Sequence, residues 1–234
     1  MSGKQRIRVM CLGDSITDGF TYAGGYRNAL GAMLAADGRQ DSFVFVGPNS
    51  SGSGCAQRHA GFVGCSICNI PAADSVTGER GGIAEIAGRL LRDDPADAVC
   101  LMIGTNDILS KYALSQFGER LEVLVRTVLG ALPDDGMLFL ATLPAMDARV
   151  PVYISSADFT PETMDAAVDG CNRQIRALAA NLQAQGERIA LAEMQDVLTK
   201  QELSDGVHPD AAGFAKIGAR WYRLLTEFAD ARKE

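Results

Sequence analysis

The sequence predicts an α/β fold built around a parallel sheet, and two observations carry that prediction. Apolar runs typical of strands alternate with amphipathic helical stretches along the whole chain, which is the pattern of helices packed on a parallel sheet. The 234 residues also contain no repeat, low-complexity tract or linker. This length fits one large domain, so we expect a single doubly wound domain spanning residues 1–234.

Five apolar runs are the expected strands, and the third is uninterrupted, as expected for a strand buried on both faces. In order, the strands are expected at residues 7–12, 42–46, 98–103, 137–143 and 188–192. Apolar residues at helical spacing predict helices at about 25–36, 83–91, 117–128, 164–182 and 209–228. Right-handed crossovers bring the carboxyl ends of parallel strands to one edge, where such sheets bind ligands. The loops after the strands are therefore the first places to look for a site.

Composition and charge exclude several function classes. Asp and Glu total 29 against 22 Lys and Arg, and the net charge is −7. Nucleic acid is not an expected partner, because binding to phosphate backbones needs clustered cations. No run approaches the ~18 apolar residues of a membrane span, and the polar residues 1–6 do not resemble a signal peptide. We therefore expect a cytoplasmic protein without a membrane span, or a secreted one if a leader has been removed.

The six cysteines leave alternatives open. Cys11 and Cys100 lie in apolar runs and are expected to be buried thiols. Cys65 and Cys68 have the spacing of zinc and redox sites, and Cys55 could form a disulfide with either of them in an oxidising compartment. A zinc site wants four ligands, and with two histidines in the chain a histidine-rich centre cannot be built. We predict no metal and no cofactor.

A serine lies at the tip of the first expected strand, in Gly13-Asp14-Ser15-Ile16-Thr17-Asp18-Gly19. The flanking glycines would let a substrate approach the Ser15 hydroxyl closely. The same residues are also ordinary turn formers, so this motif alone does not decide between a nucleophile and a turn. A phosphate loop is the poorer alternative, because neither of the nucleotide-binding motifs GxGxxG and GxxxxGK(S/T) matches these positions.

A serine nucleophile needs a base, and histidine has the ordinary pKa that suits the task near neutral pH. His208 lies in Asp205-Gly206-Val207-His208-Pro209, before the last expected helix. One turn can bring the Asp205 carboxylate to Nδ1 of His208 and leave Nε2 facing the serine. Each residue also has a plainer interpretation, His208 as an exposed loop residue and Asp205 as a helix cap.

Attack on an ester carbonyl also needs hydrogen-bond donors for the oxyanion that develops. The third expected strand is followed directly by Gly104-Thr105-Asn106-Asp107. The Asn106 side-chain amide could supply one donor, and the backbone N–H groups of Ser15 and Gly64 could supply others. An Asx turn is the alternative for Asn106. A serine, an amide and an Asp-x-x-His at one sheet edge are together improbable as coincidence.

These four segments, taken in order, resemble the sequence blocks of the GDSL or SGNH hydrolases. The resemblance spans nearly the whole chain and implies a flavodoxin-like three-layer α/β/α sandwich with a central five-stranded parallel sheet. It implies Ser15 as nucleophile, His208 as base and Asp205 as its partner, with Ser15, Gly64 and Asn106 forming the oxyanion hole. Gly64 is preferred to Gly61 because Val63-Gly64-Cys65-Ser66-Ile67 better fits the small-residue turn of that family. Within these blocks, substrate contacts are expected from Asp14, Thr105 and Val207.

Other segments resemble the acetylxylan-esterase-like branch of that family. They are Gly24-Gly25-Tyr26-Arg27, Phe45-Val46-Gly47, the loop around His59 and Ala219-Arg220-Trp221-Tyr222. A Glu usually follows the loop histidine in that branch, whereas this chain has Ala60. The residues at 144–161 form a long connection that we expect to lie beside the active site.

The resulting hypothesis is a serine esterase that hydrolyses small acyl esters, chiefly acetyl esters on carbohydrates, through an acyl-enzyme. The expected partner is a small-molecule or carbohydrate ester substrate. A lipase, a thioesterase and a phospholipid or acylglycerol deacylase would use the same residues. A non-catalytic binding module on this scaffold is a further alternative, as is a flavin- or nucleotide-binding protein, although the glycine fingerprint for dinucleotides is absent.

Overall fold

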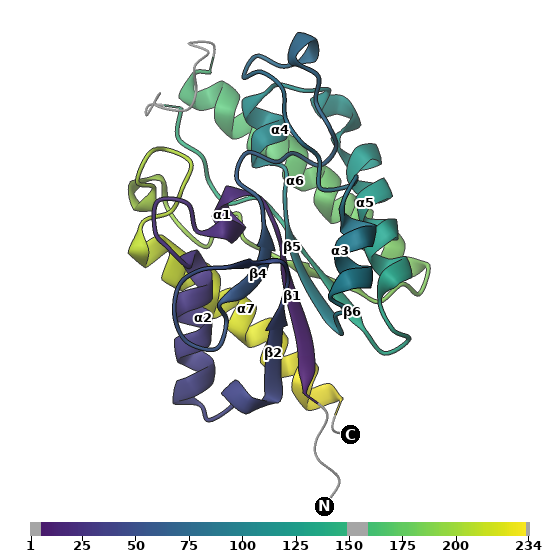
Figure 1. Cartoon of the computed structure of the whole chain (residues 1–234). Coiled ribbons are helices and arrows are strands. Elements are labelled where there is room, and N and C mark those ends of the chain that lie inside the picture. The colour runs from purple at the N-terminus through teal and green to yellow at the C-terminus, as the bar shows by residue number, and fades with distance from the viewer. Residues whose placement is uncertain (1–5, 149–158, 233–234) are drawn as a thin grey trace, which may run out of the picture.

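A mostly parallel sheet runs through the middle of the molecule between two layers of helices (Figure 1). The computed structural model describes residues 6–148 and 159–232. The strands of the described chain are β1 (Ile7–Gly13), β2 (Phe43–Val46), β3 (Asn49–Ser50), β4 (Arg58–Gly61), β5 (Ala98–Met102), β6 (Met137–Ala141) and β7 (Ile189–Ala192). The predicted α/β/α class is confirmed, with strands within two residues of the expected positions.

The five predicted strands lie parallel in the order β2, β1, β5, β6, β7, which is the order of flavodoxin-like sheets, within a sheet of seven described strands where five were expected. Val9 in β1 lies opposite Phe45 on one side and Ala98 on the other. The tip of β1 pairs instead with β4, which forms a short antiparallel ladder with β3. These two strands lie in a segment expected to be a loop. β3 has two residues and β4 reads Arg58-His59-Ala60-Gly61, so neither contains the apolar run by which the other strands were predicted.

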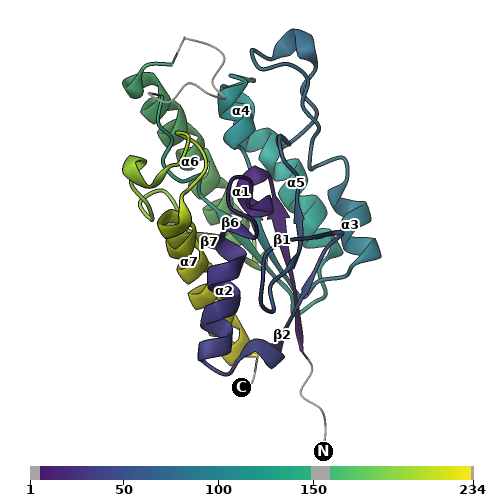
Figure 2. The same ribbon diagram turned by 60° about the vertical axis from the view of Figure 1, so that its left-hand side comes forward.

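Alternate residues of β1 face opposite helical layers. Val9 and Cys11 pack in one core with the helices α2 (Gly25–Ala36) and α7 (Ala211–Ala231), whereas Met10 and Leu12 pack in the other core, as the period of two in a strand requires. Figure 2 shows α2 and α7 on one side of the strands and α3 (Ala87–Asp93) and α5 (Phe117–Ala131) on the other. The helices of four or more residues are α1 (Ser15–Asp18), α2 (Gly25–Ala36), α3 (Ala87–Asp93), α4 (Thr105–Leu109), α5 (Phe117–Ala131), α6 (Pro161–Ala184) and α7 (Ala211–Ala231).

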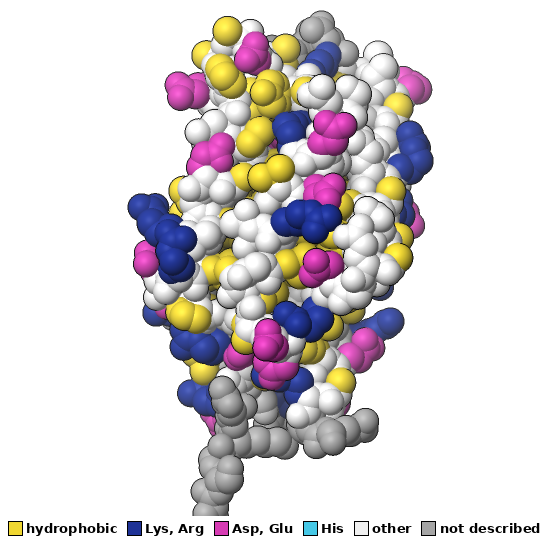
Figure 3. All heavy atoms as spheres, turned by 90° about the vertical axis from the view of Figure 1, so that its right-hand side faces the viewer, with side chains coloured by type: hydrophobic (Ala, Val, Ile, Leu, Met, Phe, Trp, Pro, Cys, Tyr) yellow, Lys and Arg dark blue, Asp and Glu magenta, His cyan; other side chains and the backbone are white. Residues whose placement is uncertain are grey.

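The helix predicted at 83–91 begins only at Ala87. Ile83 and Ala84 instead donate backbone hydrogen bonds to Ser66 and Ile67, so the apolar spacing at 83–86 reflects a loop packed on the core. On the outer face over α3 and α5, basic and acidic side chains alternate (Figure 3), consistent with the solvent side of amphipathic helices. Among the described helices, no segment combines the length and apolar character required to cross a membrane.

Three loops meet at the carboxyl edge of the sheet. Two short helices, α1 and α4, start directly after β1 and β5. The loop that holds His208 precedes α7 and ends where Asp210 caps that helix. Of the 144–161 connection, residues 149–158 lie outside the described residues, so the expectation that it borders the site stays a prediction.

Candidate active site

Ser15 stands at the first position of α1, immediately beyond the tip of β1. Asp14 caps this helix by accepting a hydrogen bond from the Ile16 N–H at 3.0 Å, and Gly19 ends it in the left-handed conformation, with φ of 87°. Gly13 lies so close to β5 that a Cβ there would sit 2.1 Å from the Met102 carbonyl oxygen. This sharp strand-to-helix turn holds the Ser15 hydroxyl at the sheet edge.

The loop before α7 brings a histidine to that hydroxyl. His208 Nε2 lies 2.8 Å from Ser15 Oγ, and His208 Nδ1 lies 2.7 Å from Asp205 Oδ2. The other carboxylate oxygen accepts the backbone N–H groups of Val207 at 3.0 Å and His208 at 2.7 Å. Burial would raise the pKa of Asp205, but these hydrogen bonds outweigh it and hold the pKa below its usual value. The carboxylate can therefore stabilise a protonated His208 ring.

Asn106 extends from α4 into the same cleft. Its Nδ2 donates to the Cys65 carbonyl at 2.7 Å and its Oδ1 accepts from Arg80 Nη1 at 3.1 Å. The neighbouring Asp107 is buried, accepts the Ile67 N–H at 3.0 Å and forms an ion pair with Arg120. Residues 106 and 107 therefore tie the strand tip to the loop that starts at residue 65.

Gly64 and Gly61 have different places in the fold. Gly64 lines the cleft and has a φ of 80°, in a turn closed by a hydrogen bond from the Cys65 N–H to the Phe62 carbonyl at 3.2 Å. A positive φ at this position of a turn favours glycine. Gly61 ends β4, where a Cβ would lie 2.3 Å from the Asp18 nitrogen. No hydrogen bond is donated by the Gly64 N–H within the described chain, which leaves it available to a ligand.

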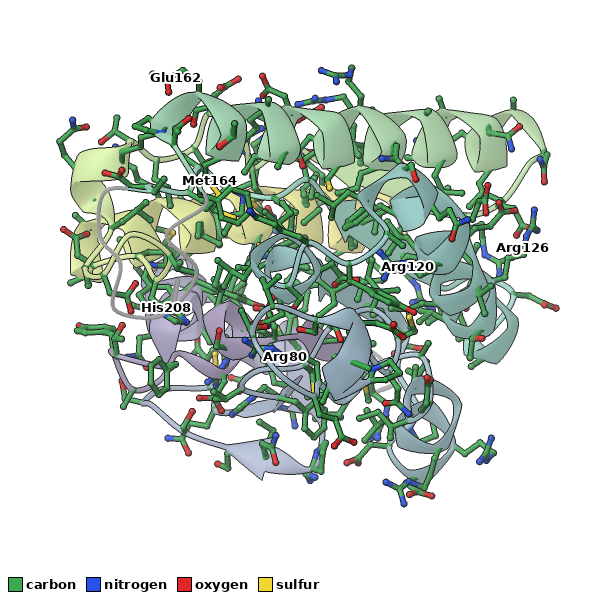
Figure 4. All side chains as sticks on the ribbon, turned by 90° about the horizontal axis from the view of Figure 1, so that it is seen from above. Arg80, Arg120, Arg126, Glu162, Met164 and His208 are labelled. Atoms are coloured by element: carbon green, nitrogen blue, oxygen red, sulfur yellow. The ribbon has the colours of Figure 1, made fainter. Side chains whose placement is uncertain are left out.

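These residues surround a cleft with a volume of about 110 Å³. The cleft is lined by Ser15, Phe20, Val63, Gly64, Arg80, Asn106, Leu109, Val207 and His208. The sequence-predicted residues Ser15, Gly64, Asn106, Val207 and His208 are thus brought together, with Asp205 behind the histidine. Figure 4, which looks down on this edge, labels His208 and Arg80.

Asp14 and Thr105, which we expected to contact substrate, do not line the cleft. They are only 1% and 2% exposed. Residues adjacent along the chain at a strand tip point in different directions, so Asp14 turns inward to cap α1 while Ser15 faces the cleft. Burial raises the pKa of Asp14 to about 6, and its Oδ2 has no hydrogen-bond partner among the described residues.

Sequence reasoning missed four residues of the cleft wall, namely Phe20, Val63, Arg80 and Leu109. The ring of Phe20 packs against that of His208, with centroids 5.0 Å apart. Phe20 follows the serine motif closely enough that the turn after α1 could have suggested it. Arg80 lies in an irregular loop remote from every motif, and nothing in its local sequence indicates the cleft.

His59 and Arg27, which belong to the other sequence motifs, lie outside the cleft and hold neighbouring backbone segments by hydrogen bonds. Burial, together with the nearby Arg27 cation, lowers the pKa of His59 to about 3, so its ring is neutral. His59 Nδ1 accepts the Gly61 N–H at 3.1 Å, and Arg27 donates to backbone carbonyls that include those of Thr17 and Asp18 at the end of α1.

All six cysteines are free, so the disulfide considered for Cys55 is not formed. The described residues contain no cluster of three or more potential metal ligands.

A parallel α/β sheet whose carboxyl edge joins a serine, a histidine and an aspartate in one hydrogen-bonded chain has the architecture of serine hydrolases. The comparison of sequence families agrees with this class. The chain belongs to the GDSL-like lipase/acylhydrolase family, whose pattern matches residues 11–216.

Relatives and solved structures add detail. The chain is similar to a multidomain esterase of Ruminococcus flavefaciens, at 29% identity over 96% of this chain, and it spans 29% of that protein's length. It is similar in fold to a family 3 carbohydrate esterase of Clostridium thermocellum, with a TM-score of 0.72 and 24% identity over 97% of this chain and 98% of that one. It is also similar in fold to a family 3 carbohydrate esterase from Talaromyces cellulolyticus, with a TM-score of 0.73 and 19% identity over 96% of this chain and 99% of that one.

Proposed function

We propose that the protein is a serine esterase that hydrolyses small acyl esters through an acyl-enzyme on Ser15. The observation that carries the proposal is the unbroken chain from Ser15 Oγ to His208 Nε2 at 2.8 Å and from His208 Nδ1 to Asp205 Oδ2 at 2.7 Å. Both distances are those of good hydrogen bonds. Membership of the GDSL-like lipase/acylhydrolase family supports the same conclusion.

In the first step, the Ser15 hydroxyl oxygen attacks the ester carbonyl carbon while His208 Nε2 takes the hydroxyl proton. The carbonyl double bond opens to an oxyanion, and Asp205 stabilises the protonated imidazole. The tetrahedral intermediate then collapses. The bond to the alcohol oxygen breaks, His208 gives that oxygen its proton, and the acyl group stays on Ser15.

The second step uses the same groups with water as the nucleophile. His208 takes a proton from water, the hydroxide adds to the acyl carbon, and collapse returns the proton to Ser15 Oγ and releases the acid. In both steps the Asn106 amide and the backbone N–H groups of Ser15 and Gly64 would donate to the oxyanion. Each preorganised donor of this kind is worth roughly 3–4 kcal/mol of barrier.

We propose short acyl groups, acetyl first, on a carbohydrate alcohol as the substrate class. The cleft volume of about 110 Å³ suits a short acyl chain better than a fatty one, since pockets for drug-sized ligands begin near ~300 Å³. The names of several similar structures point the same way. Two are called family 3 carbohydrate esterases and another, from Geobacillus stearothermophilus, an acetyl xylan esterase.

Replacing Ser15 by Ala tests the mechanism. The variant should lose hydrolysis of p-nitrophenyl acetate by about 10³-fold or more while keeping the thermal unfolding midpoint of the wild type. A fluorophosphonate probe should label the wild type at Ser15 and leave the variant unlabelled. Ser53→Ala, which changes an exposed serine, is the matched control and should behave as the wild type.

Full activity of the Ser15→Ala variant, or absence of labelling in the wild type, would remove the mechanism. The substrate class is tested separately with p-nitrophenyl esters from acetyl to hexanoyl and with acetylated sugars. A steep fall of kcat/KM with chain length supports the deacetylase, and a rise would favour a lipase or thioesterase.

A further inference from the structure

We propose that Arg80 is a positioning residue that orients the Asn106 amide donor of the oxyanion hole, an inference that rests on the proposed function. Arg80 Nη1 donates to Asn106 Oδ1 at 3.1 Å and to the Gly64 carbonyl at 3.3 Å. One guanidinium nitrogen therefore contacts both residues that flank the site where the oxyanion would form.

The contacts of Oδ1 with Arg80 and of Nδ2 with the Cys65 carbonyl together decide which way the Asn106 amide faces. With Oδ1 held by a cation and one Nδ2 proton donated to the Cys65 carbonyl at 2.7 Å, the second Nδ2 proton is left for the oxyanion. The reverse orientation would turn an amide N–H toward the Arg80 cation, and two donors cannot bond to each other. Arg80 thereby fixes the donor before substrate arrives, which is what preorganisation requires.

The charge of Arg80 adds to this effect. A hydrogen bond from a cation is stronger than one between neutral groups, and it draws electron density from the Asn106 amide, which strengthens the remaining N–H as a donor. Within residues 6–148 and 159–232, Arg80 forms no ion pair with an Asp or Glu, and its contacts are to neutral groups. Among these residues no ion pair neutralises its positive charge at the cleft wall.

Backbone and side-chain hydrogen bonds hold Arg80 in this position. Its backbone exchanges two hydrogen bonds with Ile70, both of 2.9 Å, and its Nε donates to Thr77 Oγ1 at 3.1 Å. Thr77 in turn lies 2.7 Å from the Ser110 hydroxyl, just beyond α4. The side chain is thus held from both the Cys65-to-Gly82 loop and the end of the helix that carries Asn106.

A double-mutant cycle on p-nitrophenyl acetate tests the proposal with Arg80→Met, Asn106→Ala and the double variant. Arg80→Met should lower kcat by about 10–100-fold with KM within about twofold of the wild type, and Asn106→Ala by roughly 10²–10³-fold. Because Arg80 acts through Asn106, adding Arg80→Met to Asn106→Ala should cost less than about threefold more. Arg89→Met, an exposed arginine on α3, is the matched control and should leave kcat unchanged.

Arg80→Lys keeps the charge but not the fork of donors, so it should recover part of the lost kcat. It also carries the same test if Arg80→Met does not fold. The proposal is overturned if the two substitutions multiply independently, or if Arg80→Met raises KM with kcat intact. The latter result would make Arg80 a substrate-binding residue.

An NMR readout separates this inference from the proposed function. The side-chain amide resonances of Asn106 should move strongly in Arg80→Met and stay in place in Arg89→Met, whether or not the protein turns over an ester. If the wild type neither hydrolyses esters nor reacts with a fluorophosphonate, the proposed function fails while this spectrum still decides the orienting role. Unmoved Asn106 resonances in Arg80→Met would overturn it.

Discussion

The histidine side of the cleft and its amide side are assembled from contacts of very different reach along the chain. On the histidine side, Asp205 and His208 are three residues apart and a single turn joins them. On the amide side, Asn106 bonds to residues 26 and 41 positions away, Arg80 and Cys65. A change on the histidine side should therefore alter proton transfer with the fold intact, whereas a change on the amide side acts through the loop between Cys65 and Gly82.

The largest effect expected for this comparison comes from Asp205→Asn. The Asn Oδ1 can still accept the two backbone N–H groups that Asp205 accepts, so the turn should survive. The amide N–H would then donate to His208 Nδ1 and leave the proton on Nε2, where it cannot accept the proton of Ser15. We expect kcat for p-nitrophenyl acetate to fall by about 10³–10⁴-fold with little change in the unfolding midpoint.

Asp210→Asn is the matched control, because Asp210 caps α7 through its side chain and asparagine caps a helix about as well. Its kcat should equal that of the wild type. A loss of less than tenfold in Asp205→Asn would show that His208 does not depend on Asp205 for its orientation.

The amide side is probed by Gly64→Ala, for which we expect a smaller effect. At a φ of 80° an alanine is strained, and its Cβ would lie 3.3 Å from Arg80 Nη1, so Arg80 and the N–H of residue 64 must shift together. We expect kcat to fall about tenfold, less than the loss of a whole oxyanion donor. The left-handed conformation should also cost about 1–2 kcal/mol of stability.

Gly54→Ala separates the strain from the contact. Gly54 has a similar φ of 76°, but nothing lies within 4 Å of its Cβ position. It should lose comparable stability and keep the wild-type kcat. Equal losses of kcat in the two variants would contradict the assignment of Gly64 to the cleft machinery.

The same contrast explains what could be predicted from the sequence. Ser15, Asn106, Asp205 and His208 lie in short motifs directly after strands or before a helix, and strand periodicity places such loops at one edge. The place of Arg80 in the cleft could not be predicted, because it depends on two backbone hydrogen bonds with Ile70. Such bonds between loop residues produce no periodic pattern in the sequence.

Two other misses have equally local causes. Asp14 was expected to contact substrate as a member of the Gly13-Asp14-Ser15 block, but its carboxylate caps α1. The sequence alone does not show which way a side chain turns at a strand tip. The helix expected at 83–91 begins four residues late because apolar spacing records burial, and Ile83 is buried within a loop that packs on the core.

The last prediction concerns stability and not kcat, at the buried carboxylate of Asp14. Asp14 lies under the nucleophile, and its charge interacts with His208 on one side and with Asp107 on the other. Because burial raises its pKa from 3.8 to about 6, the folded protein holds this proton more tightly than the unfolded chain. The stabilisation is complete below pH 4 and is lost as pH rises through about 6, a change of about 3 kcal/mol.

Asp14→Asn removes the titration and retains a residue that caps helices. We therefore expect the free energy of unfolding of the variant, measured by urea titration and taken relative to the wild type, to rise by up to about 3 kcal/mol between pH 4 and pH 7. Above pH 7 the difference should be constant, whatever its absolute sign. A difference that does not change across that range, or that falls, would contradict the raised pKa. It would mean that contacts such as the hydrogen bond from the Ile16 N–H compensate for the burial of the Asp14 carboxylate.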